Sequence, residues 1–171
     1  MGKFFKYATS FVNVHSMDEL WPLTSEKEYA GIEKEIAHKG QPFPPGKFLQ
    51  SNYSKKYLIL QDPSSPVYKN SDGTFNQKLF DMVQKHELTH AIRSKNNNLS
   101  VRMYDSKNRF ISGLGVFAEE LAAQRRMVKG QNISLKRKVL DYIYPVEAGI
   151  GKMINKNVKF KNLRNIIKGK I

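Results

Sequence analysis

The chain has 171 residues, enough for one domain with a substantial core, and 40% of them are hydrophobic, which argues against a disordered protein. It has no cysteine, so disulfide bonds and thiolate metal sites are excluded, and any metal must be held by histidine, carboxylate or backbone oxygen. The net charge of +14 favours an anionic partner, such as nucleic acid or an acidic surface, and weighs against a strongly basic peptide substrate. The alternative is that the charge reflects solubility and a lysine-rich proteome, because no aromatic-interleaved RNA-binding signature accompanies it.

Residues 1–22 are expected to form an N-terminal segment. Lys6 and Asn13 interrupt its apolar run before that run reaches the length of a signal-peptide core, and no clear cleavage site follows. No later run is long enough to span a bilayer. We therefore expect a protein without a standard signal peptide, located in the cytoplasm, packaged in a particle such as a virion, or exported by an unconventional route. Trp21 is expected in the core.

The next stretch predicts a helix, a stiff loop and a strand. Ser25 and Glu28 have the spacing of a capping box at the start of a helix, and Gly40 ends that helix. The proline-rich QPFPPGKF, residues 41–48, is expected to be an extended loop without regular structure. The apolar run YLIL, residues 57–60, is typical of a buried or half-buried strand.

The middle of the chain predicts a helix over residues 76–94, which three consecutive asparagines end. LSVRMY, residues 99–104, suggests a strand, and ISGLG, residues 111–115, suggests a turn marked by glycine. A helix is expected over residues 116–129, where VFAEELAAQRRMVKG ends at Gly130.

A further helix is expected from Ser134 to about Tyr144, where Pro145 breaks it. Basic residues dominate the chain from Arg125 to its end, where the only acids are Asp141 and Glu147. The basic tail, residues 149–171, is expected to be either an amphipathic helix or an extended arm, and it is the region that would bind an anionic partner.

The sequence HELTH, within residues 84–96, suggests a metal site. Two histidines four residues apart on a helix, His86 and His90, present their rings to one point. Glu87 lies beside that point, too displaced to bind the metal but close enough to take a proton from water. The alternative is an ordinary helix with two core or capping histidines.

A third ligand is required, and the other histidines, His15 and His38, lie in unrelated contexts. The candidates are Glu119 and Glu120 on the later helix. They are adjacent, so their side chains point about 100° apart. Composition does not decide between them, and each has the alternative of being a solvated charge on a helix face.

Three stretches together resemble the catalytic domain of anthrax lethal factor and, more closely, the secreted Pro-Pro endopeptidases of clostridia. These are LTSEKEYAGIEKEIAHKG, HELTHAI and LGVFAEELAAQ, which occur in the order found in that family. The resemblance implies an α+β fold, a zincin-like domain over residues 23–148 in which a short sheet packs on the HExxH helix and the C-terminal part is helical. It also implies that Glu120 is the third zinc ligand and that Glu119 supports the site or lies on the surface.

The function implied is a zinc metallopeptidase that hydrolyses peptide bonds in a protein or peptide substrate, with Zn²⁺ on His86, His90 and Glu120 and with Glu87 as general base. The YLIL strand would pair with extended substrate at the sheet edge. In that family a tyrosine, thought to stabilise the oxyanion, lies seven residues before the third ligand. The sequence departs from the family here, because the corresponding residue is Gly113. Tyr104 is the candidate substitute; losing such a donor typically lowers the rate about 10²–10³-fold.

A second interpretation is a non-catalytic structural or nucleic-acid-associated protein, for example a component of a phage particle, that retains a zincin-like fold. The charge of +14 and the glycine at position 113 favour it.

Overall fold

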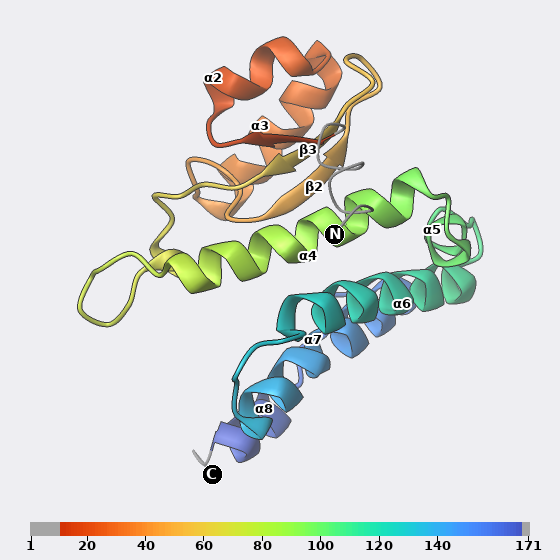
Figure 1. Cartoon of the computed structure of the whole chain (residues 1–171). Helices are drawn as coiled ribbons and strands as arrows, with labels where there is room; N and C mark the ends of the chain where they lie inside the picture. Colours follow the sequence, from red (N-terminus) through yellow and green to blue (C-terminus); the bar gives the residue numbers. More distant parts are fainter. Residues whose placement is uncertain (1–10, 169–171) are drawn as a thin grey trace. The chain divides into compact units, whose positions relative to one another are not determined.

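The computed structural model describes residues 11–168, which form two compact units (Figure 1). The first, within Met1–Ile92, contains the sheet, and the second, within Arg93–Ile171, is helical. Three strands and seven α-helices among the described residues confirm the α+β class. The boundaries predicted at residues 22/23 and 148/149 stay a prediction, and the start of the expected N-terminal segment, residues 1–10, lies outside the described residues.

The sheet has the strand order β1-β3-β2, with β1 at Phe11–Val14, β2 at Lys47–Gln50 and β3 at Tyr57–Leu60. β1 runs parallel to β3, and β2 runs antiparallel to it. The predicted YLIL strand is therefore confirmed as β3, but its expected place at the sheet edge is wrong, because it is hydrogen-bonded on both sides. The expected loop over residues 41–48 was also partly wrong, since β2 begins at Lys47.

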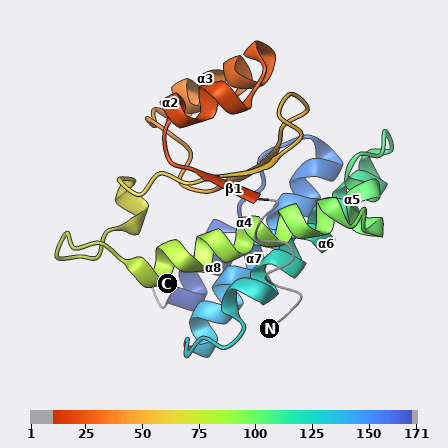
Figure 2. The ribbon, with the colours of Figure 1, turned by 45° about the horizontal axis from the view of Figure 1, so that its top comes forward.

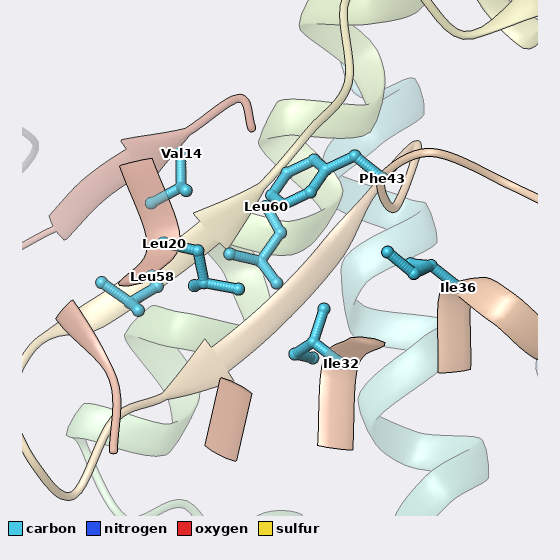
Figure 3. Close-up of a cluster of buried hydrophobic side chains, with 7 residues drawn as sticks. All are labelled: Val14, Leu20, Ile32, Ile36, Phe43, Leu58 and Leu60. Atoms are coloured by element: carbon cyan, nitrogen blue, oxygen red, sulfur yellow. The ribbon is translucent and has the colours of Figure 1, made fainter. Parts of the chain in front are cut away.

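One face of the sheet is covered by α2 (Met17–Leu20), the 3₁₀ turn η1 (Trp21–Leu23) and α3 (Glu26–Lys39) (Figure 1). The capping box of α3 is confirmed: the Ser25 hydroxyl accepts from the Glu28 amide, and the Glu28 carboxylate accepts from the Ser25 amide at 2.9 Å. Trp21 is not in the core as predicted; it is 55% exposed and its ring meets Tyr29 edge-on. Figure 3 shows the core of this layer: Val14, Leu20, Ile32, Ile36, Phe43, Leu58 and Leu60.

The other face of the sheet is covered by α4 (Gln77–Lys95), which runs along the strands in both views of the ribbon (Figures 1 and 2). The 3₁₀ turn η2 (Pro66–Tyr68) precedes it, and the fully buried Tyr68 packs edge-on against Phe80 of α4. Gln61, directly after β3, donates to the Phe80 carbonyl at 2.8 Å. The short sheet thus packs on the helix that carries HELTH, whose predicted ends are confirmed within one residue.

The second unit contains α5 (Leu99–Tyr104), α6 (Arg109–Val128), α7 (Leu135–Ile154) and α8 (Lys161–Lys168). Two predictions about α5 and α6 were wrong. The expected strand over residues 99–104 is helix α5, and the expected glycine turn over residues 111–115 lies inside α6. Both errors have one cause: a Cβ on Gly115 would lie 2.3 Å from the amide nitrogen of Tyr104, so the glycine permits close packing of α5 on α6.

Glycines also set the crossing of α6 and α7. A Cβ on Gly113 would lie 2.7 Å from the Gly149 carbonyl oxygen, and a Cβ on Gly149 would lie 2.8 Å from the Cβ of Phe117. These glycines therefore allow the two helices to pack closely and do not form a turn. A tyrosine does not fit at position 113.

Helix α7 continues through Pro145 to Ile154, so the predicted end at Tyr144 was wrong. A proline inside a helix costs about 3 kcal/mol because it removes a hydrogen bond and crowds the preceding turn. Pro145 is fully buried, and the packing of the helix around it offsets that cost. The tail, for which two conformations were open, begins within α7, and its residues Lys161–Lys168 form α8. No helix among the described residues combines the length and apolar composition needed to cross a membrane.

Helix α8 is attached to α7 by a buried carboxylate. Glu147 is 2% exposed and accepts from both Nε and Nη2 of Arg164, at 3.0 and 2.7 Å. It also accepts from the Phe160 amide at 2.7 Å. The hydrogen bonds from Arg164 hold the pKa of Glu147 below its ordinary value.

We expect Glu147→Ala to lower the free energy of unfolding by about 2–3 kcal/mol, because Arg164 and the Phe160 amide lose a buried partner. Equilibrium urea unfolding measures this loss. The matched control is Arg137→Ala, which removes a pair with Asp141 in which the arginine is 56% exposed, and should cost less than about 1 kcal/mol. Equal losses in the two variants would contradict the anchoring role.

The same carboxylate makes the stability depend on pH. Its folded-state pKa is depressed below 4.5, so its contribution is present above about pH 4.5 and is lost as the pH falls through the folded-state value. The stability difference between wild type and Glu147→Gln should therefore shrink on acidification.

Candidate metal centre

The centre of the site is a pair of histidines one turn apart on α4. The Nε2 atoms of His86 and His90 lie 3.1 Å apart, and their rings meet at a steep angle with centroids 4.8 Å apart. His86 is buried and His90 is half-buried. Because residues i and i+4 stack on one face of a helix, the two nitrogens converge on the same point.

This separation fits a zinc ion. Two nitrogens about 2.1 Å from a tetrahedral zinc lie about 3.4 Å from each other, close to the observed distance. The same separation also fits a hydrogen bond between the two rings, so the histidine pair by itself does not distinguish the two cases. Glu120 of α6, together with His86 and His90, makes up a group of residues that could hold a metal ion. Two imidazoles and a carboxylate are a donor set that zinc takes in hydrolytic enzymes.

Glu87, the expected general base, is half-buried on α4 and is not a member of that group. A Cβ on Gly46 would lie 3.5 Å from its Oε1 and 2.4 Å from Cγ1 of Val83, so the chain entering β2 passes close to this carboxylate. Tyr68 holds that segment by donating to the Pro45 carbonyl. Burial raises the pKa of Tyr68 to about 12, and the charge of Glu87 adds to the effect. Glu87 therefore lies beside the start of β2, which is at the edge of the sheet that the described residues form.

The two adjacent glutamates of α6 have different environments. Glu119 is 5% exposed and accepts from Nε of Arg93 with both oxygens, at 3.0 and 3.1 Å. The Ser100 hydroxyl also donates to Glu119, and Arg93 Nη2 donates to that hydroxyl at 2.7 Å. Glu119 thus belongs to a buried ion pair that joins the end of α4 to α5 and α6, whereas Glu120 belongs to the group with the histidines.

Sequence reasoning did not assign partners to Arg93 or Ser100. One signal was present: residues 86, 90 and 93 are spaced by four and three, so Arg93 continues the histidine face of α4.

Two tyrosines line one hollow with Glu120 in the second unit: Tyr104, which the sequence suggested, and Tyr144, which it did not. Burial raises the pKa of Tyr104, and the charge of Glu120 adds to the increase. Tyr104 therefore keeps its phenolic proton at neutral pH and can donate a hydrogen bond. Tyr144 was missed because the sequence analysis ended its helix there.

Comparison with models of protein families, with curated proteins and with solved structures finds no match. The resemblance to the lethal factor and Pro-Pro endopeptidase family therefore stays a prediction.

We expect purified protein incubated with zinc to hold one zinc ion per chain by elemental analysis, and His86→Ala to lose it, because two remaining ligands do not complete a site. His38→Ala is the matched control, since His38 is an exposed histidine on α3 and its loss should leave the zinc in place. Equal zinc in wild type and His86→Ala, with both folded by circular dichroism, would contradict the site.

Proposed function

We propose that the protein is a zinc-dependent endopeptidase. The observation that carries this proposal is the convergence of the His86 and His90 Nε2 atoms, 3.1 Å apart on a helix that also supplies Glu87. Glu120 would be the third ligand. A histidine pair with only a structural role would not require the carboxylates of Glu87 and Glu120. The resemblance of three sequence stretches to lethal factor and the Pro-Pro endopeptidases supports the same function.

The chemistry that zinc supplies when bound is polarisation of the peptide carbonyl and a lower pKa of water. The chain's own residues then have separate roles. Glu87 takes the proton of the attacking water on a carboxylate oxygen and passes it to the leaving amine. Tyr104, kept protonated by its raised pKa, donates to the developing oxyanion.

The strand that positions the substrate is β2, in place of the YLIL strand. β2 has a single neighbour, β3, within the described sheet, and its start lies beside Glu87. An extended peptide that adds to the open side of β2 would gain main-chain hydrogen bonds and pass the general base.

A non-catalytic protein that binds nucleic acid is the second candidate. It is favoured by the lysines at the C-terminal end of the described chain that are exposed: Lys152, Lys156, Lys159, Lys161 and Lys168. Its affinity for DNA or RNA should fall steeply with salt, because phosphate contacts release counterions.

Glu87→Gln should retain zinc and lower kcat at least 10²-fold on a proteome-derived peptide library, because the amide does not accept the proton. The matched control is Glu33→Gln, which changes an exposed glutamate of α3 and should keep full turnover. Unchanged hydrolysis by Glu87→Gln would remove this residue from its role. Zinc binding without hydrolysis by wild type would favour the non-catalytic candidate.

Tyr104→Phe should lower kcat by about 10²–10³-fold with little change in KM and in zinc content, because only the hydroxyl that meets the oxyanion is lost. Steady-state kinetics on a peptide identified from the library measures both constants. Tyr53→Phe, at a tyrosine that is 65% exposed, is the matched control. If Tyr144→Phe shows the loss and Tyr104→Phe does not, the donor is Tyr144.

A further inference from the structure

The hollow beside Glu120 is open and large enough for a side chain. Its volume is about 580 Å³, and it is formed within the second unit by α5, α6, α7 and the segment between α7 and α8. Among its lining residues are Glu120, Tyr104 and Tyr144, together with three lysines at positions 152, 156 and 159. A proposed metal ligand and a concentration of positive charge thus share one surface.

The wall that carries these lysines is held in a fixed conformation. Asn155 ends α7 in the left-handed region at φ 53°, and the Lys156 amide then donates to the Gly151 carbonyl at 3.0 Å. A Cβ on Gly151 would lie 2.7 Å from the Lys156 carbonyl oxygen, so this turn packs directly on the helix. Glu147 fixes the other end of the segment through the Phe160 amide. The lysines are therefore presented by ordered backbone, which reduces the entropy lost on binding.

The charges around the hollow are not balanced by its own acids. Glu147 is neutralised by Arg164, which does not line the hollow. Glu120 would be neutralised by the metal. Lys152 lies 5.2 Å over the ring of Tyr104, and Lys159 lies 5.8 Å over the ring of Tyr144. Lys159 also lies 3.6 Å from the Glu147 carboxylate, which Arg164 already neutralises. The hollow therefore carries excess positive charge beside the proposed zinc.

We propose that this hollow is a substrate subsite for an acidic side chain, Asp or Glu, close to the scissile peptide bond. The inference rests on the proposed function, because Glu120 locates the reacting bond. Lys152 and Lys156 would form charge-assisted hydrogen bonds to the substrate carboxylate, and the tyrosine rings would pack against its methylene groups. The subsite explains how a strongly basic protein selects a substrate: it recognises acidic peptides and repels basic ones.

The test compares zinc-loaded wild type with the double variant Lys152→Glu/Lys156→Glu on a proteome-derived peptide library, with cleavage sites read by mass spectrometry. Wild type should show Asp or Glu enriched at one position near the cleaved bond, and the double variant should lose that enrichment and cut acidic substrates about tenfold less efficiently. The control, Lys107→Glu/Lys129→Glu, makes the same change in net charge at two exposed lysines outside the hollow and should keep the preference.

A binding measurement separates failure of the subsite from failure of the proposed function. Fluorescent nonapeptides with a central Glu or a central Gln are titrated onto zinc-loaded Glu87→Gln protein. Tighter binding of the Glu peptide, lost when Lys152 and Lys156 are also reversed, supports the subsite even if wild type cleaves nothing. Cleavage without acidic preference, or equal binding of the two peptides, overturns it. A single-stranded oligonucleotide that displaces the Glu peptide and binds more tightly through the same lysines would assign the hollow to nucleic acid and also overturn it.

Discussion

The regular spacing of side chains along α4 is the constraint on which the rest of the structure depends. Positions 82, 86, 90 and 93 recur at intervals of three and four, so one face of the helix carries Met82, the two histidines and Arg93. Phe80 of the same helix packs against Tyr68 of η2 and accepts from Gln61 after β3, and at the end of the helix Arg93 donates to Glu119. A one-residue shift in the phase of this helix would turn the face that carries the histidines by about 100° and would break the ion pair between Arg93 and Glu119 at the same time.

Buried carboxylates paired with arginines organise the helical unit. Glu119 with Arg93 joins the end of α4 to α5 and α6, and Glu147 with Arg164 joins α7 to α8. Burying such pairs adds little net stability over an apolar contact, because each ion loses hydration. Their effect is on geometry. Arg164 donates to the two oxygens of Glu147 from two nitrogens, which favours one orientation of the carboxylate, and Arg93 divides its donors between Glu119 and Ser100. In a chain with few acids, two of them specify how helices meet.

Much of the fold could be predicted where local chemistry and packing agree. The capping box at Ser25, the apolar YLIL strand and the long helix around His86 all followed from short-range patterns. The errors lie where packing overrides propensity: LSVRMY has the composition of a strand but becomes α5, because Gly115 lets it approach α6. Pro145 has the appearance of a helix end but lies buried within one. The histidine pair was predictable because its geometry is local. The choice between Glu119 and Glu120 depends on the phase of α6, which the local pattern does not determine. The position of the lysines after Pro145 depends on the length of α7, which the local pattern does not determine either.

The close crossing of α6 and α7 restricts how the site can change. Gly113 and Gly149 bring the two backbones so near that neither position accepts a side chain unless the other helix moves. The family that the sequence resembles has its tyrosine at position 113. A side chain there would require compensating substitutions on α7, including at Met153, because a Cβ on Gly113 would overlap the Met153 side chain. A single substitution at position 113 would therefore disturb the crossing of α6 and α7, and the proposed oxyanion donor would have to come from another position, such as Tyr104 on α5.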